Sequence, residues 1–442
     1  MTKQLLEDKY DLFIDAFEEE MSLFPNDETG EIIRRVSQKH SFDISDKDFI
    51  YHLVKRIYKS WVDMDDDYFD IVTCWTLGTY FFDAWVTYPY VFINAIKRSG
   101  KTRLLKLMSV LCNNCVYTMS LKEAVLFRLP AVKGTGLFID ETEQISGREK
   151  SDLRELLNAA YKRGVSVFRM RRNPQTEKFE PDQFEVFVPI ATANIKGIDD
   201  VLADRCITLT MERSLNTQIT DKVEMFELDP KVRLFKYMMY DKTSNLVSIV
   251  HDDITKTYTL YISLINTNYT NNIINTFNTT NTDIINDFRK AKITGRDLEL
   301  WLPLFIVKEV FTEVYSDIIS IASKYAEERR TTDVMEDYTS NIIVTLARFI
   351  QDKNAEEFFL LNDICHLYNQ ENEIDEKNKW AMKSRRLQNQ LKKLKLINER
   401  RRVGQGVEVR LRFDKIKSWI KRMGIEITPV EEKQETLVEK EF

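Results

Sequence analysis

The sequence has few residues of the kinds that interrupt helices or build disulfide frameworks. Its 442 residues include 12 glycines, 9 prolines and 5 cysteines. Low glycine and proline counts favour helices over many tight turns. An odd, irregularly spaced set of cysteines is typical of a reducing interior and excludes a disulfide scaffold. We therefore expect a helix-rich protein whose stability comes from a hydrophobic core.

Signals for a bound zinc ion or a membrane span are also missing. Cys112 and Cys115 form an isolated C-x-x-C, whereas a structural zinc site needs four ligands. The longest apolar stretch, residues 71–96, is interrupted by Asp83, while a membrane span needs about 20 uninterrupted apolar residues. The first 24 residues are acidic and do not have the pattern of a signal peptide. These features predict a soluble, cytoplasmic protein without a membrane partner.

The chain is too long for one ordinary core. Apolar residues recur at helical spacing in residues 1–85, and short apolar runs alternate with helical patterns in residues 86–215. Such alternation predicts an α/β domain with a mostly parallel sheet. The strands are expected at 90–94, 115–119, 136–140, 165–170, 184–193 and 206–211, and the intervening helices at 101–112, 121–129 and 149–161.

Three further regions follow this α/β domain. Residues 216–335 are expected to form a helical lid with an irregular Asn/Thr-rich insertion at about 240–287. Residues 336–425 show the order helix, strand, helix, helix, hairpin, which is typical of a winged helix-turn-helix. Residues 426–442 form an acidic tail that we expect to be disordered.

A phosphate-binding loop is predicted between the first strand and the first helix of the α/β domain. Residues 95–102 read AIKRSGKT, with alanine where such a loop usually starts with glycine. Backbone N–H groups at the start of the following helix would face phosphates. Lys101 is expected to reach the outer phosphates of ATP, and the Thr102 hydroxyl to hold Mg²⁺. The expected nucleotide-binding residues are Arg98, Ser99, Gly100, Lys101, Thr102 and Arg103.

A pair of carboxylates ends the apolar run at 136–140. Asp140 is expected to hold Mg²⁺ with Thr102, and Glu141 to polarise the attacking water. One strand and one helix separate the two motifs, as in the P-loop subclass with an additional strand. Together the motifs predict ATP hydrolysis with ATP and Mg²⁺ as cofactors, and the intact residues argue against a decayed, non-enzymatic P-loop.

Two polar positions further along are candidates for completing the site. Asn194 follows the strand predicted at 184–193 and is expected to position the γ-phosphate and its water, with Thr192 as the alternative. Arg205 precedes the last strand, where an arginine at a subunit edge could enter a neighbour's site as an arginine finger. A local pair with Asp204 is the alternative for Arg205.

At these residues the chain resembles the uncharacterised P-loop ATPases of phages, plasmids and archaeal mobile elements, which are often fused to or encoded beside primases. The resemblance covers roughly residues 70–310. It is carried by Trp75–Tyr80, Tyr88–Tyr90, Arg98–Leu105, Phe138–Glu141, Leu153, Arg154, Leu157–Ala159, Gly164, Arg169, Leu202–Ile207, Arg213, Gly295, Arg296, Trp301, Pro303 and Leu304.

The resemblance implies an AAA+-like or superfamily 3 helicase-like motor domain. It places the family's lysine, threonine, acids and late arginine on Lys101, Thr102, Asp140, Glu141 and Arg205. It also implies that Arg296 is a second sensor arginine contributed by the helical lid. The expected fold is therefore an AAA+-like P-loop NTPase core with a helical N-terminal region, a helical lid and a C-terminal winged helix.

Positive charge is concentrated near the C-terminus of a chain whose net charge is −6. Residues 377–422 contain 17 lysines and arginines against three acidic residues, which is the electrostatic pattern of a duplex-binding domain. The alternative is a solvated basic face or a protein-binding winged helix. The expected DNA-binding residues are Arg385, Arg386, Gln388, Asn389, Lys392 and Lys393 on the recognition helix, and Arg400, Arg401 and Arg402 on the wing.

A second basic segment lies between the strands predicted at 165–170 and 184–193. Arg171, Arg172 and Lys178 would grip the DNA backbone if this segment entered the channel of a ring. The alternative is an ordinary charged hairpin tip.

The sequence as a whole predicts a DNA-dependent ATPase of a mobile replicon. It would assemble as a hexameric ring, with primase or other replication proteins as possible partners, and move on or unwind DNA. The alternative is an ATP-switched initiator or helicase loader that binds DNA without unwinding it. No further acidic cluster with metal-ligand spacing supports a primase or a nuclease.

Overall fold

The structure is a computed structural model that describes residues 3–96, 98–119, 128–129, 134–140, 154–172, 177–194, 200–241, 245–266, 286–336, 338–372, 374–375, 381–404 and 406–423. Its internal contacts divide the chain into two compact units, Met1–Ser323 and Lys324–Phe442. In the described parts of both units, no helix is both long enough and apolar enough to cross a membrane.

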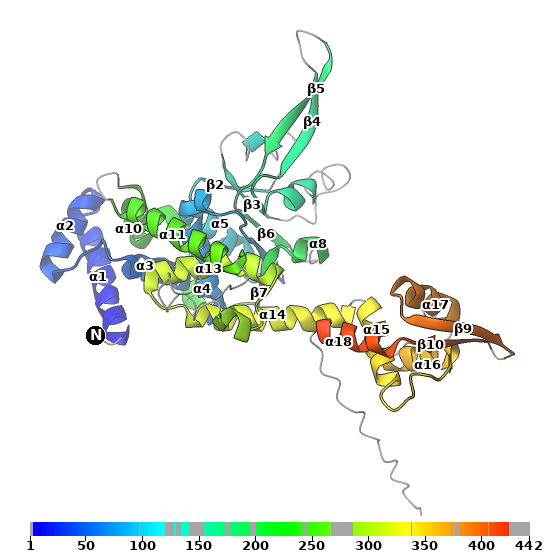
Figure 1. The fold of residues 1–442 in the computed structure, drawn as a ribbon. Coiled ribbons are helices and arrows are strands. Elements are labelled where there is room, and N and C mark those ends of the chain that lie inside the picture. Colours follow the sequence, from blue (N-terminus) through cyan, green and yellow to red (C-terminus); the bar gives the residue numbers. More distant parts are fainter. Residues whose placement is uncertain are drawn as a thin grey trace, which may run out of the picture. The chain divides into compact units, whose positions relative to one another are not determined.

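The first unit is built around a five-stranded parallel sheet (Figure 1). In space the strands follow the order β2-β3-β6-β1-β7. Their bounds are β1 Tyr90–Ala95, β2 Cys115–Thr118, β3 Gly136–Ile139, β6 Ile190–Asn194 and β7 Cys206–Met211. The predicted parallel α/β sheet is therefore confirmed.

Burial on both faces explains why the central strands are almost continuously apolar. All four residues of β3 are buried, and five of the six residues of β1 are buried. One face packs on Leu156, Leu157 and Ala160 in a single core cluster. On the other face Trp75 makes an edge contact with Phe138, at 5.8 Å between ring centroids. Parallel strands covered on both sides need this composition.

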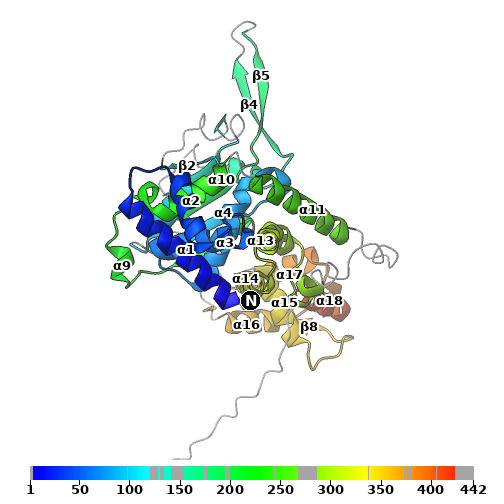
Figure 2. The same cartoon turned by 90° about the vertical axis from the view of Figure 1, so that its left-hand side faces the viewer.

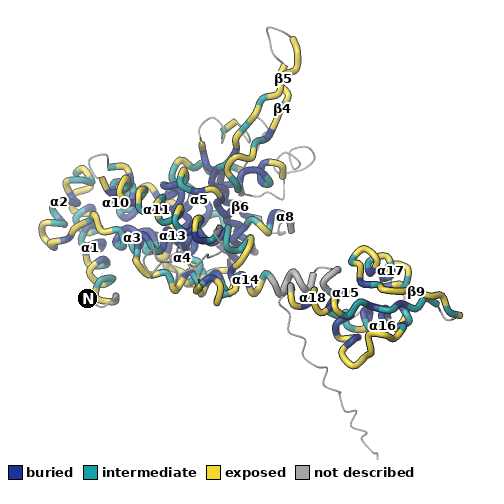
Figure 3. Tube along the Cα trace, in the orientation of Figure 1, coloured by how far each residue is buried: buried dark blue, intermediate teal, exposed yellow. Residues whose placement is uncertain are grey.

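The prediction of a single strand at 184–193 is wrong, because this segment contains the end of one strand and the start of another. β5 (Phe179–Glu185) pairs with β4 (Ser166–Arg172) in an antiparallel hairpin, and β6 joins the central sheet only from Ile190. The connection between them carries buried Val186 and Val188, which kept the apolar pattern continuous in the sequence. Figures 1 and 2 show the hairpin projecting from the sheet, and Figure 3 shows that its outer part is mostly exposed.

The first half of the Asn/Thr-rich insertion expected at about 240–287 is helical. Helix α11 spans Leu246–Asn266. Its buried side chains Val250, Ile254, Tyr258 and Tyr261 recur every three or four residues and form a helical stripe among the threonines and serines. Residues 267–285, the most Asn/Thr-rich part, lie outside the described residues, as do residues 121–127 of the helix predicted at 121–129.

Helices surround the sheet in the first unit. Before β1 the chain forms α1 (Lys3–Leu23), α2 (Thr29–His40), α3 (Lys47–Trp61), α4 (Asp66–Gly78) and the 3-10 helix η1 (Thr79–Ala84). Helix α5 (Lys101–Leu111) follows β1. After β6 come α8 (Asp200–Ala203), α9 (Thr217–Thr220), η3 (Phe226–Leu228), α10 (Pro230–Tyr240), α11 and α13 (Arg296–Thr312). Helix α14 (Ser316–Glu336) begins in this unit, and its residues from Lys324 belong to the second.

A buried ionic cluster joins α13 to the N-terminal helices. Asp70 of α4 is 8% exposed and accepts hydrogen bonds from Lys308 of α13 (3.1 Å) and Lys55 of α3 (2.8 Å). Tyr51 of α3 donates to the same carboxylate, and the Lys308 ammonium lies 4.0 Å from the centre of its ring. Helix α13 is thereby held to α3 and α4, from which it is distant in the sequence.

The second unit has the predicted order of helix, strand, helix, helix and hairpin. Its elements are α15 (Tyr338–Phe349), β8 (Phe359–Leu360), α16 (Leu361–Glu371), α17 (Ser384–Lys393), β9 (Ile397–Val403), β10 (Gly406–Leu411) and α18 (Phe413–Met423). The three strands form an antiparallel sheet in the order β8-β10-β9. Leu387 and Leu391 of α17 are fully buried in the core of this unit with Val409 of β10.

Candidate functional site

The loop between β1 and α5 contains two described residues with a positive φ. Gly100 precedes α5 with φ 87°, a left-handed conformation that favours glycine. Arg98 also has a positive φ, 66°, which is uncommon for a residue with a side chain. The loop therefore delivers the first backbone N–H groups of an 11-residue helix to the carboxyl edge of the sheet.

Three side chains from two elements, α5 and β2, converge on one carboxylate at this edge. Asp140, directly after β3, accepts hydrogen bonds from Thr102 (2.7 Å), Lys101 (3.2 Å) and Tyr117 (3.1 Å). Burial alone would raise the pKa of Asp140, which is 2% exposed. The Thr102 hydrogen bond and the Lys101 charge outweigh it and lower that pKa below its ordinary value. The carboxylate is therefore ionised at neutral pH and adjoins a hydroxyl and an ammonium.

A cavity of about 300 Å³ opens beside these residues. Its lining includes the loop residues from Arg98 to Arg103. Ser99 is 4% exposed, and its Oγ has no hydrogen-bond partner within the described part of the chain. Because buried polar atoms are almost always hydrogen-bonded, this hydroxyl is a ready donor for a ligand that enters the cavity.

The opposite wall of the cavity comes from segments that the sequence did not single out. They are the end of α3 and the segment after β7, represented by Trp61, Val62, Asp63, Ser214, Ile219, Thr220 and Glu224. Ser214 ties the two together, since its hydroxyl donates to Asp63 at 2.6 Å. No motif marks these residues, because only folding brings residue 61 beside residue 100.

Arg103, predicted to bind the nucleotide, is engaged with this wall. Its guanidinium donates to the backbone carbonyls of Ile219 and Lys222 (2.8 Å) and lies 3.6 Å from the Glu224 carboxylate. Lys106, one turn further on, also pairs with Glu224, at 3.1 Å. Arg103 therefore holds the segment after β7 against α5. It is also one of the residues that line the cavity.

The structure describes some, but not all, of the other catalytic residues predicted at this edge. Asn194 ends β6 in register with Asn94 of β1, so its backbone lies at the carboxyl edge with the loop. Thr192, the alternative, is 2% exposed, and its Oγ1 lacks a hydrogen-bond partner among the described residues. Glu141 lies outside the described residues.

Arg205 and Arg296 lie at the other edge of the sheet. The carbonyl of Arg205 accepts a hydrogen bond from the N–H of Tyr90, the first residue of β1. Arg296 pairs with Asp204 at 3.2 Å, and both guanidinium groups lie over the ring of Tyr161. The structure therefore does not bring Arg296, the expected sensor, near Lys101 of the same chain.

The basic residues of the β4–β5 hairpin are largely neutralised. Arg171 pairs with Asp182 at 3.1 Å and Arg172 pairs with Glu177 at 3.4 Å, while Lys178 is exposed. Phe168, Met170 and Phe179 are each more than half exposed on this hairpin. Its outer part thus presents apolar side chains beside internally paired charges.

In the second unit the predicted recognition helix is basic on its solvent side. Arg385, Arg386, Asn389, Lys392 and Lys393 of α17 are exposed, and Gln388 is half-buried.

The wing arginines divide between two faces. Arg401 pairs with Glu408 at 2.6 Å and covers the ring of Phe358. Arg400 and Arg402 lie on the opposite face of β9, because their neighbours in the register are Val409 and Val407, and Val409 is buried in the core of this unit.

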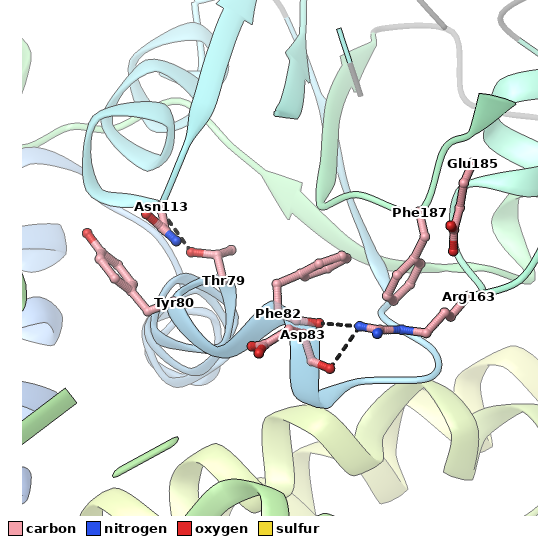
Figure 4. Close-up of a pocket in the computed structure, with 8 residues that line it drawn as sticks. All are labelled: Thr79, Tyr80, Phe82, Asp83, Asn113, Arg163, Glu185 and Phe187. Carbon is pink, nitrogen blue, oxygen red and sulfur yellow. Dashed lines mark hydrogen bonds between the residues drawn. The ribbon is translucent and has the colours of Figure 1, made fainter. Parts of the chain in front are cut away.

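A second cavity, of about 400 Å³, is lined by Thr79, Tyr80, Phe82, Asp83, Asn113, Arg163, Glu185 and Phe187 (Figure 4). Arg163 donates to the carbonyls of Trp85 (3.0 Å), Phe82 (3.3 Å) and Asp83 (2.9 Å). It thereby satisfies carbonyls at the end of η1, where helix termini leave acceptors without partners. No predicted site residue lines this cavity.

Comparison with known proteins identifies no family. No family model matches the sequence, and no curated protein matches it. Among solved structures, the chain is similar to JCV helicase bound to a thiazolopyridine acetamide (TM-score 0.25, 13% identity, covering 55% of this chain and 77% of that one).

The chain is also similar to JCV helicase bound to another inhibitor (TM-score 0.24, 13% identity, covering 59% of this chain and 88% of that one). A third similarity is to Drosophila ORC bound to DNA (TM-score 0.21, 12% identity, covering 84% and 92%). TM-scores this low establish no function for this chain.

Proposed function

We propose that this protein is a DNA-dependent ATPase with an AAA+-like P-loop core, which couples Mg·ATP hydrolysis to movement on or unwinding of DNA in a mobile replicon. The observation that carries the proposal is the convergence of Lys101 and Thr102 on the buried Asp140 carboxylate, beside a cavity lined by the preceding loop. A site for a nucleoside triphosphate requires a glycine-containing loop, the N-terminus of a helix, a hydroxyl group and a carboxylate.

The residues present fit ATP and Mg²⁺. The Ser99 hydroxyl and the N–H groups at the start of α5 would donate hydrogen bonds to phosphate oxygens. Lys101 would turn from Asp140 toward the outer phosphates, and Thr102 and Asp140 would hold Mg²⁺ through oxygen atoms, which this ion prefers. Bound Mg²⁺ would neutralise charge that develops on the transferred phosphoryl group.

The remaining catalytic roles belong to residues at the same edge or in another copy. Glu141, which follows Asp140 directly, would orient water and accept its proton. Asn194 would orient the same water from the end of β6. Arg205 would be supplied by a neighbouring copy, because its own chain holds it at the far edge of the sheet. A closed ring such as a hexamer gives every site such a neighbour.

The second unit supplies the proposed contact with DNA. Winged helices use a recognition helix and a β-hairpin wing, and the exposed basic side chains of α17 and β9 are in those two positions. Lys and Arg would bind phosphates, while Gln388 and Asn389 would contact base edges. The pairing of Arg171 and Arg172 with carboxylates makes the β4–β5 hairpin the weaker candidate for phosphate contacts.

The division of the wing arginines leads to a test of DNA binding. Replacing Arg400 and Arg402 together by alanine should weaken duplex binding and lower the slope of log K against log salt by about two. Arg401→Ala is the control, to be compared with the single replacements Arg400→Ala and Arg402→Ala: it removes the same single charge from the opposite face and should change the slope by less than about one. The measurement is fluorescence anisotropy with labelled duplex at several salt concentrations. An equal effect of Arg401→Ala would remove the wing from the DNA interface.

Steady-state ATP hydrolysis, with and without single-stranded and duplex DNA, tests the motor function. DNA should stimulate the wild-type protein several-fold, and Glu141→Gln should be inactive while still binding ATP. A forked substrate should then be unwound by the wild type only. Slow turnover that DNA does not change, together with sequence-specific duplex binding, would instead identify an ATP-switched initiator or helicase loader.

A further inference from the structure

Two arginines from distant parts of the chain meet at one tyrosine. The guanidinium carbon of Arg205 lies 4.9 Å from the centre of the Tyr161 ring, and that of Arg296 lies 4.6 Å from it. Arg296 also binds Asp204, the residue before Arg205, at 3.2 Å, and Glu299 at 2.7 Å. The first residue of α13 is therefore attached to the segment that carries Arg205.

Three backbone-based contacts place this cluster at the amino edge of the central sheet. The N–H of Tyr90 donates to Arg205, and the N–H of Tyr88 donates to Tyr161, both at 3.0 Å. The hydroxyl of Thr87 donates to the carbonyl of Glu299 at 3.2 Å. The phosphate loop begins only after Ala95, at the other end of β1.

The length of β1 separates the cluster from the cavity of its own chain. Six residues of strand span about 20 Å at about 3.3 Å per residue. This distance is well beyond the reach of an arginine side chain. Neither Arg205 nor Arg296 can therefore contact a nucleotide bound to Lys101 of the same molecule without a large rearrangement.

We propose that Arg296 is a positioning residue that acts in trans: through Asp204 and the Tyr161 ring it holds Arg205 toward the nucleotide cavity of a neighbouring copy. This inference rests on the proposed ATPase function and concerns the same site. It replaces the role of a sensor in its own subunit, which the sequence resemblance implies for Arg296.

Helix α13 also connects the cluster to the cavity of its own chain. It packs on α3 and α4, and its Lys308 binds Asp70 in the buried ionic cluster. The end of α3 supplies Trp61 and Val62 to the cavity wall. A nucleotide that moved α3 would therefore also move Arg296. Through Arg296 it would change the position of Arg205, which faces the neighbouring copy in this proposal.

Subunit mixing tests the inference. Alone, Arg296→Gln should lower kcat by about tenfold to a hundredfold, less than the loss expected for a charge-stabilising donor itself, with ATP affinity unchanged within about twofold. When Arg296→Gln is co-expressed with Lys101→Ala, the mixed oligomer should regain hydrolysis. At some interfaces the intact Lys101 of an Arg296→Gln subunit then faces the intact Arg205 cluster of a Lys101→Ala subunit. Arg205→Ala should be rescued by the same partner.

The controls separate positioning from stability and from the proposed function itself. Tyr161→Phe, which keeps the ring, should retain activity, whereas Tyr161→Leu should behave like Arg296→Gln. Lys290→Gln changes an exposed pair made with Asp287 of the same segment and should have no effect.

Wild-type hydrolysis that is lost in Lys101→Ala establishes the ATPase independently. If Arg205→Ala is rescued by mixing but Arg296→Gln is not, Arg296 acts in its own subunit and the inference is overturned. The same holds if Arg296→Gln lowers ATP affinity.

Discussion

Lys101→Ala is expected to abolish ATP hydrolysis without unfolding the protein. Lys101 is the ammonium nearest to Asp140, at 3.2 Å, among the described contacts of that carboxylate. Loss of one preorganised charge-stabilising group typically lowers kcat by about 10²–10³. The measurement is phosphate release at saturating ATP, with circular dichroism to verify the fold.

Lys106→Ala is the matched control for this prediction. Lys106 lies on the same helix, is 40% exposed in its side chain, and pairs with Glu224 at 3.1 Å. Surface pairs contribute about 0–1 kcal/mol, so hydrolysis should be nearly unchanged. Persistent hydrolysis in Lys101→Ala would show that the cavity beside Asp140 is not the site of the reaction.

Asp70→Asn is expected to cause a large loss of stability. The substitution leaves the ammonium groups of Lys308 and Lys55 without their carboxylate, and Lys308 is only 3% exposed. Removing one partner of a buried ion pair costs about 3–5 kcal/mol, because the remaining charge stays desolvated. The measurement is the free energy of unfolding from urea titration, monitored by tryptophan fluorescence.

Asp66→Asn on the same helix is the control for Asp70→Asn. Its side chain is 89% exposed and pairs with Lys59 at 3.3 Å, so the free energy of unfolding should change by less than about 1 kcal/mol. A loss in Asp70→Asn that is no larger than in this control would mean that the cluster is solvated in solution.

The same cluster makes stability depend on pH in the acid range. Burial alone would raise the pKa of Asp70, but the charges of Lys308 and Lys55 lower it below its ordinary value. The contribution of a carboxyl with a lowered folded-state pKa is fully present above its unfolded pKa of about 3.9 and is lost as pH falls through the folded value. The stability difference between the wild type and Asp70→Asn should therefore shrink below about pH 4.

Local patterns were enough to predict four of the five strands of the central sheet. The apolar runs beginning at residues 90, 115, 136 and 206 are strands, because each is short and bounded by polar or turn-forming residues. The same patterns predicted that Thr102 and Asp140 hold Mg²⁺ and that Lys101 reaches the phosphates, and these roles stay predictions. The structure places all three side chains within hydrogen-bonding distance at Asp140.

Patterns misled where burial came from the rest of the fold. Val186 and Val188 are buried outside any strand, and they hid the boundary between β5 and β6. The threonines of α11 concealed a buried stripe whose partners lie in distant helices such as α13. In both places the packing partner is far away in the sequence, so no local window contains the information.

The sequence by itself determined where most strands of the parallel sheet lie, which residues form the proposed nucleotide site beside Asp140, and that basic residues concentrate in the C-terminal unit. These follow from short-range periodicity and from the few residue types that can bind phosphate and magnesium. Only the tertiary structure decided that α3 forms a wall of the cavity, that Arg103 holds the segment after β7, and that Arg205 and Arg296 share Tyr161 at the far edge. Those facts depend on which distant surfaces are buried against one another, and long-range packing has no signature in a local stretch of chain.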